Sequence, residues 1–124
     1  MGLALKQPPL AETIKALCAV RPGALPIASS AAKAGLALAE YLDAFQKSNP
    51  QMPIPHIGPT ASEGIGFEWF SADGAGRELT IMFHADNGVF EYYKTDPING
   101  REEEGEFIQP EEVLALLTWL VSAP

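Results

Sequence analysis

The sequence has few of the side chains that build disulfides and metal sites. Its 124 residues include one cysteine, Cys18, and two histidines, His56 and His84. A single cysteine cannot form an internal disulfide. The two histidines are not spaced four residues apart and no cysteine cluster accompanies them, so the ligand pattern of a structural zinc site is missing. We therefore expect a reduced protein without a metal or another cofactor.

Long apolar runs are also missing. The longest lies at residues 113–121, which is far shorter than the roughly 18 apolar residues that a membrane-spanning helix needs. The first residues lack the charged leader, apolar core and small-residue cleavage site of a secretory signal. The sequence therefore predicts a cytoplasmic protein without a membrane role.

Positive charge is scarce, and negative charge is concentrated in one half of the chain. There are 8 Lys and Arg against 16 Asp and Glu, a formal net charge of −8. Residues 1–62 hold five basic and three acidic side chains, whereas residues 63–124 hold three basic and thirteen acidic ones, so the halves carry +2 and −10. An acidic surface repels phosphate backbones, which disfavours direct DNA or RNA binding. The same surface attracts basic proteins.

The first part of the chain predicts two helices and a connector. Residues 10–20 repeat apolar side chains at the four-and-three spacing of one helix face. Residues 28–47 are rich in good helix formers, and Ser29 or Ser30 is the expected N-cap because a serine hydroxyl accepts a hydrogen bond from a first-turn amide. Residues 49–59 contain four prolines, a composition that forbids a helix and suits an extended connector.

Beyond the connector, apolar residues alternate with other residues, which is the period of a β-strand. The dipeptide Asn87-Gly88 tolerates the positive φ angles of a tight hairpin turn. The last alternating segment is acidic enough to be an edge strand, because charge on an exposed strand blocks unwanted pairing. The expected strands are residues 65–70, 78–84, 89–95 and 102–108.

The last apolar stretch predicts a third helix. Pro110 suits a first helical position, and Glu111 and Glu112 oppose the positive end of the helix dipole. The apolar stripe that follows is broad, so it needs a large partner surface, which the sheet provides. The expected fold is a single α+β domain. It has a helical part at residues 1–48, the connector, and an antiparallel four-stranded β-meander with a C-terminal helix packed on it at residues 60–124.

One stretch of the sequence resembles a known group of proteins. Pro59-Thr60, Gly64 and Phe67-Glu68-Trp69, followed by Arg77-Glu78-Leu79, resemble the Pro-Thr, Gly, Leu-Glu-Trp and Arg-x-Leu core of a group of small uncharacterised bacterial proteins. The resemblance implies the same succession of a proline-bounded helix, a meander and a leucine-rich last helix. Members often carry a Trp-Asp pair ahead of the helix, where this chain has Arg21-Pro22-Gly23. The group has no established activity, so the resemblance implies a fold and no function.

No motif assigns a catalytic residue. Cys18 lies beside the apolar stripe of the first helix, as a buried and unreactive cysteine does. Gly64 and Gly66 form a Gly-x-Gly that precedes a strand instead of opening a helix, which indicates a turn and not a dinucleotide site. The glutamates within residues 102–106 are typical of a solvated edge. The sequence therefore favours a protein without enzymatic activity.

The second face of the predicted sheet decides between possible functions. Alternation places Glu68 on the face opposite Phe67 and Trp69. If the first two helices cover that face, it is core, and if they leave it uncovered, it is a contact surface rich in aromatic and sulfur groups. The side chains expected to form a patch there are Phe70, Met82, Phe90 and Tyr92.

Two classes of function follow from the charge and from these candidate residues. The first is a non-enzymatic acidic module, inhibitor-like or antitoxin-like, that binds a basic partner protein and occludes its surface. Its expected contact residues are Glu91, Tyr92, Glu102, Glu103, Glu104 and Glu106. The alternative is a small-molecule-binding domain or minimal hydrolase with a pocket near His56, Glu68 and His84. A homodimer through an uncovered sheet face is a third, architectural alternative.

Overall fold

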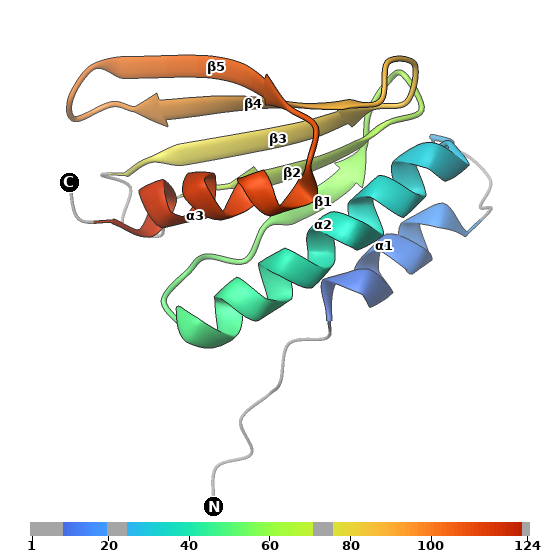
Figure 1. The fold of residues 1–124 in the computed structure, drawn as a ribbon, viewed down its shortest axis with the longest axis horizontal. Helices are drawn as coiled ribbons and strands as arrows, with labels where there is room; N and C mark the ends of the chain where they lie inside the picture. The colour runs from blue at the N-terminus through green and yellow to red at the C-terminus, as the bar shows by residue number, and fades with distance from the viewer. Residues whose placement is uncertain (1–8, 20–24, 71–75, 123–124) are drawn as a thin grey trace, which may run out of the picture.

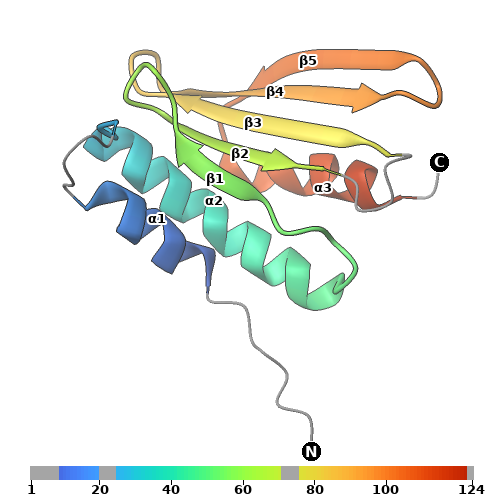
Figure 2. The ribbon, with the colours of Figure 1, turned by 180° about the vertical axis from the view of Figure 1, so that it is seen from behind.

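The computed structural model describes residues 9–19, 25–70 and 76–122, which form two layers. One layer is an antiparallel sheet, and the other holds three helices on one side of that sheet (Figures 1 and 2). The expected α+β class is confirmed, with two N-terminal helices, a meander and a C-terminal helix against the sheet. Arg21-Pro22-Gly23 and residues 71–75 lie outside the described residues. The elements are α1 (Leu10–Cys18), α2 (Ser29–Ser48), β1 (His56–Pro59), β2 (Ile65–Trp69), β3 (Glu78–His84), β4 (Val89–Asp96), β5 (Arg101–Phe107), the 3-10 turn η1 (Pro110–Glu112) and α3 (Val113–Val121).

The sheet contains five strands in sequence order, and not the expected four. The additional strand is β1, which lies inside residues 49–59, where the sequence predicts only a connector. It pairs with β2 alone, opposing His56 to Glu68 and Ile57 to Phe67. Proline cannot donate a ladder hydrogen bond, but an edge strand has one side that needs no donor. A proline-rich segment can therefore still form an edge strand, which is why its composition conceals it.

Two of the turns show how the local sequence sets the sheet. Gly88 has a φ of 71°, so Asn87-Gly88 forms the predicted hairpin turn between β3 and β4. In the β1–β2 turn, the Thr60 N–H donates to the Gly64 carbonyl and the Gly64 N–H donates to Thr60 Oγ1, both at 3.1 Å. This pair of hydrogen bonds closes the turn and sets the register of β1 on β2.

The core lies between the sheet and the helices. Alternation along β2 buries Ile65, Phe67 and Trp69 completely, and β3 follows the same pattern. Each large apolar side chain that is fully buried contributes about 1.5–3 kcal/mol relative to an exposed one. A one-residue slip would turn these side chains away from the helices, so the core also fixes the strand register. The helices complete it with Ile14, Ala31, Leu38, Leu42, Val113, Leu116, Leu117 and Leu120.

The start of α2 differs from the prediction. Its N-cap is Ala28, and no side-chain hydrogen bond caps it, so the expectation of a cap at Ser29 or Ser30 is wrong. The Ala28 N–H instead donates to the Glu63 carbonyl in the β1–β2 turn at 2.8 Å. The entry of α2 is therefore tied to the sheet through the backbone, and this contact cannot be read from the local sequence.

The start of the C-terminal helical segment is capped by a side chain. Glu112 Oε2 accepts hydrogen bonds from the N–H groups of Ile108 (3.2 Å) and Gln109 (3.0 Å). Gln109 and Glu112 thus form a reciprocal capping box ahead of Pro110, which occupies a first helical position as predicted. None of the helices in the described part of the chain is long and apolar enough to cross a membrane.

Candidate functional site

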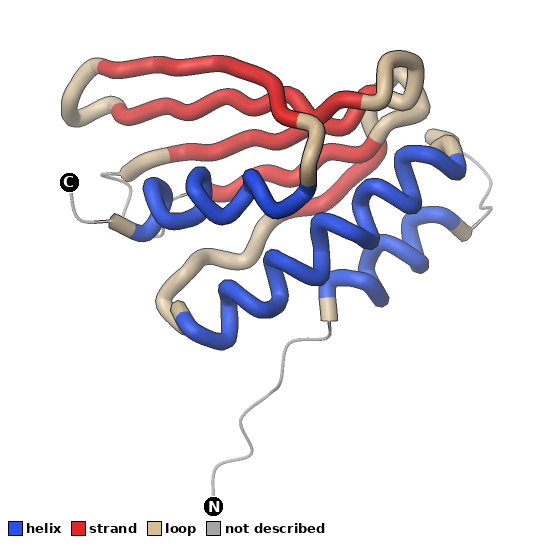
Figure 3. Tube along the Cα trace, in the orientation of Figure 1, coloured by secondary structure: helices blue, strands red, loops and turns tan. Residues whose placement is uncertain are grey.

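The helices cover only one face of the sheet. In Figure 3 the helices lie together on one side of the strands, and no described element covers the other side. We call this other side the open face; it is formed by alternate residues of each strand, beginning with His56, Gly66, Glu78, Val89 and Glu102. The first two helices therefore do not cover it, which leaves the second face of the sheet available for contact.

Charge is distributed unequally between the two faces. The strands place no lysine or arginine on the open face. The three basic side chains of residues 63–124, which are Arg77, Lys94 and Arg101, all belong to the helix side. The glutamates of the open face are Glu68, Glu78, Glu91, Glu102, Glu104 and Glu106. The open face therefore carries a net negative field.

One of these glutamates is held by its neighbours. The Tyr93 hydroxyl donates to Glu91 Oε1 at 2.5 Å, and His84 Nε2 lies 2.7 Å from Glu91 Oε2. The hydrogen bond from Tyr93, followed by that from His84, lowers the pKa of Glu91, and the Glu91 carboxylate raises the pKa of Tyr93. Glu91 is therefore a fixed negative charge at the middle of the open face, beside a tyrosine ring that is 39% exposed.

The open face also contains a hollow. Its volume is about 140 Å³, and His56, Glu68, Thr80 and Met82 stand around it. Gly58 and Gly66 are partners in the β1–β2 register, so the floor has no side chains. We call this hollow the Glu68 pocket. It brings together two residues of the predicted small-molecule site, His56 and Glu68.

The third residue of that predicted site lies elsewhere. His84 does not line the Glu68 pocket, because its imidazole is bonded to Glu91. Among the described residues, no group of three or more His, Cys, Asp or Glu side chains could hold a metal ion. Cys18 is free and partly buried against the core.

The predicted contact residues divide between the two faces. Glu91, Glu102, Glu104 and Glu106 lie on the open face, whereas Tyr92 and Glu103 lie on the helix side. There the Tyr92 hydroxyl donates to Glu103 Oε2 at 3.1 Å. Consecutive residues of a strand point to opposite faces, so a continuous run of contact residues along β4 or β5 was geometrically excluded.

The predicted aromatic patch is wrong for two of its four residues, Phe90 and Tyr92, for the same reason, whereas Phe70 is 54% exposed. Phe90 is 2% exposed and packs among the core aromatics. Tyr92 also lies on the helix side of the sheet. Met82 lies on the open face, and the aromatic side chain next to it there is Tyr93. The sequence already indicated that Tyr93 shares a face with Glu91, because the two residues are two positions apart in β4.

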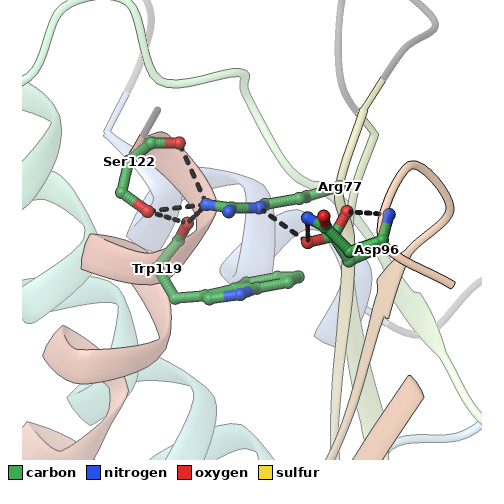
Figure 4. Close-up of polar contacts among 5 residues, drawn as sticks. Arg77, Asp96, Trp119 and Ser122 are labelled. Atoms are coloured by element: carbon green, nitrogen blue, oxygen red, sulfur yellow. Dashed lines mark hydrogen bonds and ion pairs between the residues drawn. The ribbon is translucent and has the colours of Figure 1, made fainter. Parts of the chain in front are cut away.

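A second polar cluster lies on the helix side and joins β3, β4 and the end of α3 (Figure 4). Arg77 Nη1 donates to the carbonyls of Trp119 (2.6 Å) and Ser122 (2.9 Å), and to Ser122 Oγ (2.6 Å). Its Nε lies 3.5 Å from Asp96 Oδ2. The carbonyls at a helix C-terminus lack intrahelical donors and carry partial negative charge, so Arg77 caps α3 from outside the helix.

The indole of Trp119 packs against this cluster. Arg77 Cζ is 5.1 Å and Lys94 Nζ is 4.7 Å from its ring centroid, within the range of cation–π attraction. Asp96 is 6% exposed; a hydrogen bond from the Asn99 side chain is the main cause that lowers its pKa, with a smaller contribution from Arg77.

A pocket of about 330 Å³ lies beside this cluster. It is lined by three basic and three acidic residues, and two ion pairs, Arg77 with Asp96 and Lys94 with Glu103, already join four of them. The cluster therefore fastens α3 to the sheet. The cluster could not be predicted from local sequence patterns because Arg77 is 42 and 45 residues away from Trp119 and Ser122.

Comparison with known proteins returns no match: no family model, no curated protein and no solved structure is similar enough to this chain to assign it. The resemblance to small bacterial proteins stays a prediction. The open face and the Arg77 cluster are therefore the two features whose geometry and charge bear on function.

Proposed function

We propose that this protein is a non-enzymatic binding module whose open face binds a basic surface of another protein and occludes it, as an inhibitor or antitoxin-like partner does. The observation that carries the proposal is the separation of charge across the sheet. Six glutamates lie on the face that no described element covers, and the basic side chains of the same half lie on the other. Such a field accelerates encounter with a positively charged surface.

The open face also has the make-up of a contact surface. Protein interfaces combine aromatic and methionine side chains at the centre with a polar rim. Met82 and Tyr93 lie on the central strands β3 and β4, and Glu102, Glu104 and Glu106 lie on the edge strand β5. Arranged in this way, the glutamates orient a basic partner while the central side chains exclude water.

The same arrangement argues against a second copy of the chain, a nucleic acid or a small molecule as the partner of the open face. Two copies of the open face, related by a twofold axis, would bring six glutamates against six, and like charges in contact are repulsive. Nucleic acid is repelled for the same reason. The Glu68 pocket, at about 140 Å³, is smaller than the roughly 300–1,000 Å³ that is typical of small-molecule sites. These comparisons favour a basic protein over a second copy, a nucleic acid or a metabolite.

The experiment is a capture of partners by three forms of the tagged protein at low salt, followed by mass spectrometry. The forms are the wild type, the open-face variant Glu102→Lys with Glu104→Lys, and the control variant Glu12→Lys with Glu40→Lys. All four glutamates are exposed, and the control pair lies on the helices. We expect a basic protein that is captured by the wild type and the control but not by the open-face variant.

Capture alone does not support the proposal, so the captured protein is then titrated with salt. The dissociation constant of a complex held by opposite charges rises steeply with ionic strength. A partner that binds all three forms equally, or whose affinity is independent of salt, contradicts the proposed function.

A further inference from the structure

The Glu68 pocket is a fixed feature of the open face. Strand register places His56, Glu68 and Thr80 in one row across β1, β2 and β3. The adjacent row begins with Gly58 and Gly66, so two neighbouring strands present only backbone beside Glu68. Because the floor consists of paired backbone, the floor itself does not depend on the rotamer of a flexible side chain.

Glu68 lines this hollow, and none of the described residues is its partner. Its side chain is partly buried on a strand between β1 and β3, and it makes no hydrogen bond or ion pair with any other described residue. A carboxylate that has lost part of its hydration and gained no partner lies at a free-energy disadvantage. A cation in the pocket removes this disadvantage through a charge-assisted hydrogen bond.

We propose that the Glu68 pocket receives an arginine side chain of the basic partner, an inference that rests on the protein-binding function proposed above. The guanidinium group is planar, and its fork of donors matches a carboxylate in two parallel hydrogen bonds. The flat floor at Gly58 and Gly66 suits a planar group, and Met82 borders the space for the apolar stem of the side chain. The lysine ammonium is a strongly hydrated point charge and matches neither feature.

The two glycines of the floor provide a direct way to fill the pocket. A Cβ built on Gly58 has only His56 Nε2 nearby, at 4.0 Å, and one built on Gly66 meets Thr60 Cγ2 at 3.5 Å and Met82 Cγ at 3.7 Å. These are ordinary van der Waals distances, and neither glycine has a positive φ. Gly58→Ala and Gly66→Ala therefore fold and place a methyl group where the guanidinium lies.

The test is a titration of the ¹⁵N-labelled full chain with two blocked amino acids, N-acetyl-arginine methylamide and N-acetyl-lysine methylamide, at low salt. Amide chemical shifts of β1, β2 and β3 report occupation of the pocket. We expect the arginine probe to shift the amides around Gly58, Gly66 and Glu68, and to bind about threefold to tenfold more tightly than the lysine probe. Glu68→Gln and Gly66→Ala weaken arginine binding by a similar factor.

Glu104→Gln is the matched control, because it removes the same charge from the open face outside the pocket. It leaves the arginine affinity at the pocket within about twofold of the wild type. If arginine and lysine bind equally, or if Glu68→Gln and Glu104→Gln have the same effect, attraction to the open face is diffuse and the arginine pocket is contradicted. That result does not contradict the proposed function. The proposed function is contradicted separately if no captured basic protein requires Glu102 and Glu104 for binding.

Discussion

The two faces of the sheet use charge in opposite ways. On the helix side every basic side chain of the second half lies near an acidic one, and Arg77 joins Asp96 to the end of α3. On the open face the strands place no lysine or arginine beside the glutamates, although His84 and Tyr93 bond Glu91. Charges that are paired within the chain stabilise the fold, whereas charges left without an internal partner are available to a partner protein. The paired residues therefore hold the structure, and the open-face glutamates are the residues that we propose for binding.

The largest expected effect is the loss of Arg77 on the helix side. Arg77→Ala removes three hydrogen bonds to the end of α3 and leaves Asp96 without its cation. We expect the free energy of unfolding to fall by about 2–4 kcal/mol in urea titrations. Arg101→Ala is the control, since Arg101 is exposed, and it costs no more than about 0.5 kcal/mol. Equal effects of the two changes contradict the structural role of the Arg77 cluster.

The second largest effect is the loss of stability when alanine replaces one of two nearby glycines that have different surroundings. A Cβ on Gly64 would overlap the Phe83 carbonyl oxygen and lie 2.7 Å from Thr60 Oγ1, so the β1–β2 turn would have to move. We expect Gly64→Ala to destabilise the fold by about 1–3 kcal/mol. Gly66→Ala, which points into the Glu68 pocket, changes stability by no more than about 0.5 kcal/mol. Chemical denaturation of both variants checks this, and a large loss for Gly66→Ala contradicts the open space at that position.

Acid tests the polar cluster on the helix side through Asp96. Its pKa lies below the usual 3.8, chiefly because the Asn99 side chain donates to it. The folded protein therefore binds this proton only at lower pH than the unfolded chain, so the stabilising contribution is complete above about pH 4 and is lost as the pH falls through the folded pKa. Unfolding midpoints measured between pH 2 and 7 in roughly unit steps should show a drop below pH 4 that is smaller in Asp96→Asn. If the unfolding midpoint of Asp96→Asn falls below about pH 4 as much as that of the wild type, Asp96 does not contribute to stability in this way.

The smallest effect is on the thermal unfolding midpoint, and it compares two glutamates of strand β5 that lie on opposite faces. Glu106 directly opposes Glu91 on the open face, so Glu106→Gln relieves repulsion and raises the thermal unfolding midpoint slightly. Glu103, on the helix side, accepts from Lys94 Nζ at 3.3 Å and from Tyr92, so Glu103→Gln lowers the midpoint. Differential scanning calorimetry at low salt measures both. Shifts of the same sign would contradict the division of charge between the faces.

Much of the fold could be predicted from periodicity, and little of the site could. Alternation gave the strands β2 to β5 and the placement of Glu68, because the period of two is a local property. The edge strand β1 was hidden by prolines that tolerate an edge, and the backbone contact of Ala28 with Glu63 has no sequence signal. The acidic surface was predicted from composition. Tyr92 and Glu103 were assigned to it, although alternation along their strands places them on the helix side. The Arg77 cluster joins segments more than 40 residues apart, so only the packed structure reveals it.

The central claim is that the open face, and not the net charge of the chain, binds a basic partner. The most direct measurement is the association rate constant of the captured partner at a series of salt concentrations, for the wild type and both double variants. We expect the Glu102→Lys, Glu104→Lys variant to associate at least about tenfold more slowly at low salt, and the Glu12→Lys, Glu40→Lys variant to remain close to the wild type. If the two variants, which change the net charge equally, slow association equally, the partner responds to overall charge and the account is contradicted.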